Sequence, residues 1–178
     1  MNKSENKFFE RYILLRDEID NKSMKIETEH TKQMECKKGC DMCCMDYKIL
    51  PIEYHFIIND LKIKKIVPEI SALTKEEGGC IFLINHACTI YNQRPVICRT
   101  HGLPLLFMNG NSEWELSACD LNFKNYNFED FTLDNTFPQD KYNSKLFMLN
   151  KEFISDFQEK KYGEFELISL KNIVEQLI

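Results

Sequence analysis

The chain has 178 residues, of which 43% are hydrophobic and 29% charged, and its formal net charge is −5. This length suits one domain with a buried core, and the hydrophobic content excludes wholesale disorder. The acidic balance argues against a nucleic-acid partner, because phosphate backbones attract basic surfaces.

The amino-terminal residues lack the apolar core of a secretion signal, and no window reaches the roughly 18 uninterrupted apolar residues of a membrane span. We therefore expect a cytoplasmic protein with no membrane partner. The chain has eight cysteines, which are not expected to persist as disulfides in a reducing compartment. Metal or cluster ligation is the better use for them.

Residues 4–34 predict a long amino-terminal helix, because no Gly or Pro interrupts them and apolar residues recur at helical spacing. Gly39 then predicts a turn inside a cluster of cysteines. Residues 47–50 predict a short strand beyond this cluster. Residues 52–61 predict a helix, and Pro51 suits its first turn.

A hairpin and a short helix follow, and both carry cysteines. Residues 80–91 predict a tight hairpin with a cysteine opening each arm, at Cys80 and Cys88. Such a hairpin would hold these two thiols at a defined separation. After it, Asn92 suits the cap of a short helix that carries Cys98.

A second hairpin is predicted over residues 103–116, where two apolar runs flank the turn pair Asn109-Gly110. Cys119 follows this hairpin, which we expect to bring it toward the other cysteines. Residues 120–140 are rich in Asn, Asp and Phe without a clear period, so we expect an ordered loop there.

Helical spacing returns over residues 141–157. Gly163 ends this pattern, residues 165–168 predict a short strand, and Ser169 suits the cap of a last helix.

These elements predict an α+β fold, a small and mostly helical single domain with two short β-hairpins organised around a cysteine-ligated metal centre. We expect three parts along the chain. Residues 1–35 are the amino-terminal helix, residues 36–120 are a cysteine-rich metal-binding domain, and residues 121–178 are a loop and helices that pack on that domain.

All eight cysteines lie in the middle of the chain, four of them within nine positions. All are candidate metal ligands: Cys36, Cys40, Cys43, Cys44, Cys80, Cys88, Cys98 and Cys119. Four thiolates either close the shell of zinc or hold a 4Fe–4S iron–sulfur cluster. Adjacent side chains generally point apart, so Cys43 and Cys44 fit one zinc poorly. They indicate two neighbouring centres, or one ligand beside a supporting thiol, and favour iron–sulfur slightly over zinc.

The order of these motifs resembles the bacterial CxxCxxCC family. The resemblance covers about residues 36 to 120 and rests on the cysteine cluster, then Cys88-Thr-Ile-Tyr-Asn-Gln-Arg-Pro-Val-Ile-Cys-Arg and finally Cys119. The first gap holds three residues where the family's name has two. The resemblance implies a zinc- or iron-chelating domain. Some members are linked to lysine N-methylation of flagellin, which would imply S-adenosylmethionine as a cofactor.

Several side chains near the cysteines are candidates for supporting the metal or for binding substrate. Four thiolates on a dipositive zinc ion or 4Fe–4S core leave −4 + 2 = −2, which calls for nearby cations and donors. Arg94 and Arg99 lie beside cysteines in sequence, His101 could donate a hydrogen bond or replace a thiol, and Tyr91 is expected to pack over the centre. The remaining histidines are interpreted as surface or satisfied core residues: His30, His55 and His86.

Two functions follow from these observations. The first is a metal-binding protein with a structural, redox or accessory role. The second is an S-adenosylmethionine-dependent lysine N-methylase acting on a protein substrate, which rests on the resemblance, because no glycine-rich methyltransferase loop is found in the sequence. Catalysis by a nucleophilic cysteine fits poorly, since a ligated thiolate is not available for attack.

Overall fold

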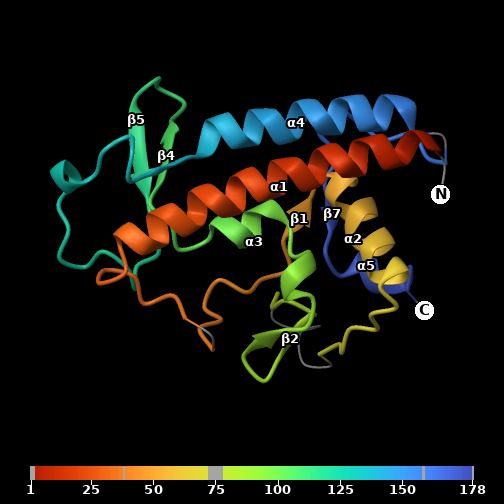
Figure 1. The fold of residues 1–178 in the computed structure, drawn as a ribbon, viewed down its shortest axis with the longest axis horizontal. Coiled ribbons are helices and arrows are strands. Elements are labelled where there is room, and N and C mark those ends of the chain that lie inside the picture. Colours follow the sequence, from red (N-terminus) through yellow and green to blue (C-terminus); the bar gives the residue numbers. More distant parts are fainter. Residues whose placement is uncertain (1–2, 38, 72–77, 158, 178) are drawn as a thin grey trace. The chain divides into compact units, whose positions relative to one another are not determined.

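The computed structural model describes residues 3–37, 39–71, 78–157 and 159–177 (Figure 1). It has an α+β fold, as predicted. Its contacts divide the chain into two compact units, which are described separately below. The first unit comprises Met1–Tyr12, Lys38–Pro95 and Phe147–Ile178, and the second comprises Ile13–Lys37 and Val96–Leu146.

Helices and aromatic side chains build the core of the first unit. Helix α1 (Lys3–Glu29) begins here, and α2 (Pro51–Ile63), the last turns of α4 (Gln139–Asp156) and the short α5 (Asn172–Glu175) complete it. The rings of Tyr12 and Phe56 lie 4.9 Å apart, and those of Phe8 and Phe153 lie 5.9 Å apart. Edge-to-face contacts of this kind join α1 to α2 and α4.

Two short antiparallel strand pairs complete the first unit. Strand β1 (Lys48–Ile49) pairs with β7 (Ile168–Ser169), so the segment after the cysteine cluster is held by the end of the chain. Strand β2 (Leu83–Ile84) pairs with β3 (Ala87–Cys88) to form the first predicted hairpin, which the 3-10 helix η2 (Tyr91–Gln93) follows.

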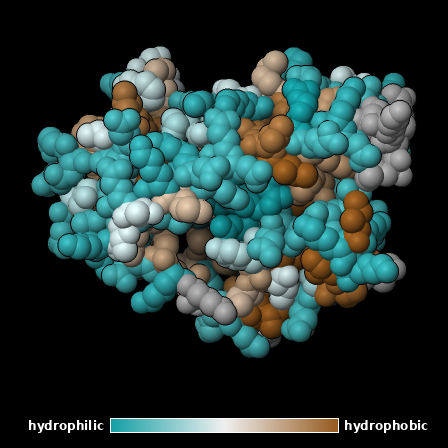
Figure 2. All heavy atoms as spheres, viewed as in Figure 1, coloured by the Kyte–Doolittle hydropathy of each residue, from teal (hydrophilic) through white to brown (hydrophobic). Residues whose placement is uncertain are grey.

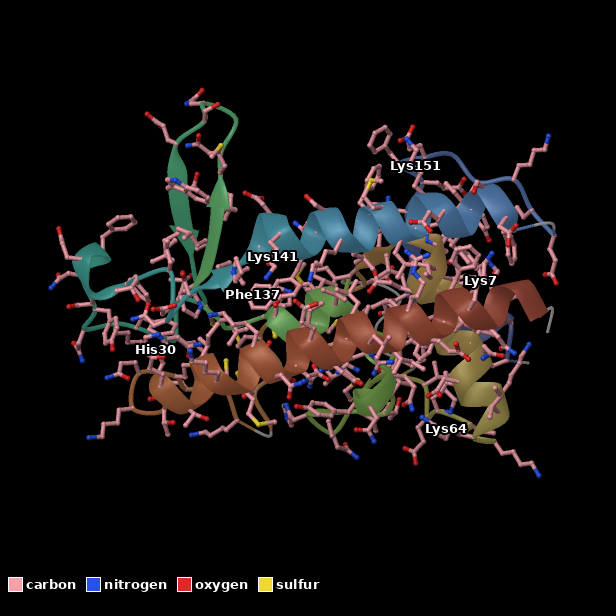
Figure 3. All side chains as sticks on the ribbon, turned by 45° about the horizontal axis from the view of Figure 1, so that its top comes forward. Lys7, His30, Lys64, Phe137, Lys141 and Lys151 are labelled. Carbon is pink, nitrogen blue, oxygen red and sulfur yellow. The ribbon has the colours of Figure 1, made fainter. Side chains whose placement is uncertain are left out.

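The second unit contains a three-stranded sheet in the order β5-β4-β6. Strands β4 (Leu105–Met108) and β5 (Trp114–Ser117) form the second predicted hairpin, and β6 (Phe137–Pro138) adds to β4 in parallel. The unit also includes α3 (Val96–Thr100) and the 3-10 helix η3 (Phe128–Asp130). Phe137 stacks on Tyr142 at 4.9 Å, and Figure 3 shows Phe137 between the hairpin and the start of α4.

Both hairpins are confirmed, but one turn differs from its prediction. Asn85 and His86 have φ values of 49° and 59°, the left-handed conformation that a two-residue hairpin turn requires. The second hairpin turns through the longer loop from Asn109 to Glu113. Its left-handed residue is Ser112, with φ 62°, and not Gly110. The Asn109 side chain accepts hydrogen bonds within the loop, so Asn-Gly is not a two-residue turn.

Four other predictions are corrected. Helix α1 ends at Glu29, earlier than expected. Asn92 lies inside η2 and does not cap α3. Residues 120–140 contain η3 and β6, because β6 is stabilised by pairing with β4 and not by local periodicity. Ser169 lies in β7 and donates its hydroxyl to Asp46, so it does not cap α5.

Polar side chains predominate on the face drawn in Figure 2, with apolar ones in small groups. Among the residues that the structure describes, no helix is both long and apolar enough to cross a membrane.

Candidate metal centre

A backbone contact between two distant segments brings cysteines together in the first unit. The amide of Cys80 donates to the carbonyl of Cys44 at 3.3 Å, and Asp46 donates to Gly78 at 3.0 Å. A β-bridge joins Met45 to Gly79 between these bonds. The cysteine cluster and the hairpin segment, separated by more than thirty residues, therefore run side by side.

The β2–β3 hairpin adds a third thiol. Cys88 pairs with Leu83 across the hairpin, and the amide of Leu83 donates to the carbonyl of Cys80 at 3.1 Å. Cys88 therefore lies on one arm of the hairpin, as predicted, whereas Cys80 lies in the turn before β2 and not at the start of the other arm. Cys80 is buried, and Cys44 and Cys88 are half-buried.

The proximity of these thiols affects their pKa values. Burial raises the pKa of Cys44 to about 12, and the nearby Cys43, Cys80 and Cys88 raise it further. Burial is also the main cause that raises the pKa of Cys80 to about 11. Without a cation the thiols stay protonated at neutral pH, whereas a bound cation favours the thiolates.

The chemistry of this donor set fits zinc or iron. None of the eight cysteines, all of which the structure describes, forms a disulfide. Buried, adjacent thiols are the donors that soft and borderline metals prefer. Within the described part of the chain, no three His, Cys, Asp or Glu side chains converge in the geometry of a bound ion. The thiols thus lie near one another but are not arranged as the ligands of a bound ion.

Arg94 supplies positive charge to this neighbourhood. Burial raises the pKa of Cys88, and the positive charge of Arg94 opposes that rise. The guanidinium lies over the ring of Tyr91, 3.8 Å from its centroid, and this ring is 59% exposed. Tyr91 was expected to pack over the centre, but the structure places its ring against Arg94 with one side in solvent. A cation–π contact of this kind orients the guanidinium.

Two polar residues that sequence reasoning missed hold the loops in place. Asp41, between the cysteines of the cluster, bonds the imidazole of His86 at the hairpin turn at 2.8 Å. Tyr47 donates its hydroxyl to the carbonyl of Cys43 at 3.0 Å. The sequence alone does not indicate either role, because each side chain bonds to a partner that only folding brings close.

Cys36, Cys98 and Cys119 lie in the second unit, where Asn122 organises the surroundings of Cys36. The amide nitrogen of Asn122 lies 3.3 Å from the Cys36 sulfur and 2.8 Å from the carbonyl of Gly102. The backbone amide of Asn122 donates to the carbonyl of Cys119 at 2.9 Å. Asn122 therefore links two of the three cysteines, and nothing in its sequence context indicated this role.

Arg99 and His101 also lie in the second unit. Arg99 is buried and donates to Asp20 on α1, so part of its guanidinium serves an ion pair within this unit. Burial lowers the pKa of His101, which favours the neutral imidazole that can accept or donate a hydrogen bond.

The other histidines behave as the sequence predicts. His30 is buried and bonded to the carbonyl of Asn135 at 2.9 Å, and His55 is bonded to the Tyr162 hydroxyl at 2.7 Å. His86 lies at the surface beside Asp41.

Comparison with known proteins supports metal chelation. Residues 35–120 match the model of the CxxCxxCC family, which is described as "Putative zinc- or iron-chelating domain". No curated protein and no solved structure matches the chain. The family description concerns metal binding and gives no support to the lysine N-methylase alternative.

Proposed function

Because residues 35–120 form a domain of the CxxCxxCC family, we propose that the first unit binds an iron–sulfur cluster through Cys44, Cys80 and Cys88, with Cys43 or Cys40 as the fourth ligand. The cluster would serve a structural or redox role in an accessory protein. A 4Fe–4S cluster takes four thiolates, one for each iron.

The proposal rests on one observation, the gathering of thiols around Cys44. The amide of Cys80 donates to the carbonyl of Cys44 at 3.3 Å, and Cys43, Cys80 and Cys88 each act to raise the pKa of Cys44, although these cysteines come from two separate segments. Neighbouring thiols that form no disulfide are a donor set that a bound cation would convert to thiolates.

The doubled cysteine favours a cluster over a single zinc ion. The Cα atoms of Cys43 and Cys44 are joined by one peptide unit of about 3.8 Å, and neighbouring side chains diverge from it. The irons of a cluster lie apart, so diverging thiols can reach different irons. One zinc ion offers no such separation.

Charge balance supports the same site. Four thiolates and a dipositive 4Fe–4S core leave −4 + 2 = −2 in a partly buried place. Arg94, held against Tyr91, provides a positive charge next to Cys88.

Anaerobic purification and an optical spectrum test this proposal. We expect a broad absorption band near about 400 nm that dithionite bleaches, with iron and sulfide in the protein. Cys80→Ser and Cys88→Ser are each expected to lose this band. A colourless protein with stoichiometric zinc would mean that these thiols bind zinc and not a cluster.

Met42→Ser is a matched control, because Met42 lies inside the cysteine cluster, is 75% exposed and is no candidate ligand. It should keep the full absorption band. If Cys80→Ser and Cys88→Ser also keep the band and the metal content, the ligand assignment is wrong.

A further inference from the structure

An apolar depression of about 280 Å³ lies in the second unit, and no cysteine is among the residues that line it. Residues from β4, β5, η3 and the loop after η3 line it, among them Leu106, Trp114, Leu116, Phe128, Phe131 and Leu133. In Figure 1 the β4–β5 hairpin stands beside the loop that carries η3.

The rim of this depression exposes large apolar side chains. Trp114 is 59% exposed, Phe128 is 62% exposed and Leu133 is 76% exposed. A single exposed apolar residue is ordinary, but several around one depression mark an interaction site. Aromatic residues are also those most enriched at the centres of protein interfaces.

The segment that supplies most of the lining residues, residues 113–134, is strongly acidic. Residues 113–134 contain six acidic side chains and one lysine, 1 − 6 = −5, which equals the net charge of the whole chain. All six acidic residues are exposed: Glu113, Glu115, Asp120, Glu129, Asp130 and Asp134. Charge complementarity therefore selects a basic partner and disfavours nucleic acid and anionic membranes.

Strand β5 offers backbone groups to such a partner. In the described ranges β5 pairs only with β4, so its other edge is open. Alternation along the strand puts Trp114 and Leu116 on the face of the depression and Glu115 on the opposite face. An extended segment beside β5 would thus meet hydrogen-bonding groups, apolar side chains and negative charge together.

We propose that this surface binds an extended, basic segment of another protein, which adds to the edge of β5 and inserts an apolar side chain among Trp114, Phe128 and Leu133. Lysine or arginine residues flanking that side chain would face the exposed carboxylates of Glu129, Asp130 and Asp134, which adjoin the lining residues in sequence. This inference concerns the second unit and does not depend on the metal proposed for the first.

Trp114 makes the proposal directly measurable, because it is the only tryptophan of the chain. The probe is a synthetic peptide that alternates lysine with leucine and phenylalanine, added to the full metal-loaded protein. Burial of the exposed indole should shift its emission to shorter wavelength. The affinity should fall several-fold when the salt concentration rises from about 0.05 to 0.5 M, because screening weakens exposed charge contacts.

Two control peptides separate the contributions. A lysine–serine peptide lacks the apolar side chain, and a glutamate–leucine–phenylalanine peptide reverses the charge. Neither should shift the emission at the same concentration. An equal shift with either one, or no shift with the basic apolar peptide at millimolar concentration, would overturn the proposal.

Variants locate the site on the protein. Phe128→Ser and Leu133→Ser should each weaken peptide binding about fivefold or more. Leu14→Ser is the matched control, because Leu14 is 67% exposed on α1 in the same unit and does not line the depression. Unchanged affinity in both rim variants would also overturn the proposal.

A second copy of the chain is the competing occupant. It would shift the Trp114 emission as protein concentration rises without peptide, with dimers seen by analytical ultracentrifugation. That result would overturn the assignment to a basic partner.

Discussion

Gly102 shows how closely the backbone approaches a cysteine in the second unit. Its φ of +90° lies in the left-handed region, and a Cβ atom built there would stand 2.4 Å from the sulfur of Cys36. The carbonyl of Gly102 accepts a hydrogen bond from the side chain of Asn122. Glycine is therefore required both by its conformation and by the space that the thiol occupies.

We predict that Gly102→Ala destabilises the protein by about 1–3 kcal/mol, because the methyl group strains the backbone and displaces Cys36. Urea unfolding measures this loss. Gly110→Ala is the control, since an added Cβ there meets nothing within 4 Å and the residue has no positive φ. Equal stability of the two variants would mean that the Cys36 sulfur lies elsewhere.

At the scale of elements, helix α2 depends on a residue of another helix. Its N-cap residue, Leu50, makes no side-chain hydrogen bond to the helix. The amide of Ile52, in the first turn, donates instead to the side chain of Asn150 on α4 at 3.1 Å. The first amides of a helix have no acceptor within the helix. Because Asn150 is fully buried, its side chain, and not solvent, supplies the acceptor for the Ile52 amide.

We predict that Asn150→Ala lowers the free energy of unfolding by about 1–2 kcal/mol, because it leaves a buried helix-terminal amide without an acceptor. Thermal or urea unfolding checks this value. Asn143→Ala on the exposed face of α4 is the matched control and should change stability by less than about 0.5 kcal/mol. A comparable loss in both variants would point to the helix propensity of α4 and not to the cap.

At the scale of the whole molecule, the cysteines divide between the two units. Cys40, Cys43, Cys44, Cys80 and Cys88 belong to the first, and the other three belong to the second. Metal bound to such residues contributes directly to folding free energy, because the unfolded chain has no preformed site.

We predict that Cys44→Ser, in the first unit, lowers both metal content and the urea midpoint of unfolding, because Cys44 is one of the proposed ligands. Metal analysis of the purified variant and its unfolding curve measure the two effects. Ala118→Ser, which places a hydroxyl beside Cys119, should retain the metal content of the unaltered chain. Cys44 would be removed from the ligand set if Cys44→Ser kept full metal content and an unchanged midpoint.

Much of this protein was readable from its sequence. Local patterns predicted α1, α2 and α4, because apolar residues at helical spacing and Pro51 at a first turn act within one segment. They also predicted both hairpins, the first of which carries Cys88 on β3. The order of the cysteines predicted the match to the model of the CxxCxxCC family, which covers residues 35–120.

Only the tertiary structure decided the rest. Strand β6 forms because β4 is beside it, and Asn122 reaches Cys36 because folding brings together residues far apart in sequence. The bond from Cys80 to Cys44 and the position of Arg94 beside Cys88 are likewise products of packing. Residue types and spacings act within a segment and therefore determined the chemistry available to this protein. Contacts between segments depend on the whole fold, and they decided which thiols are neighbours.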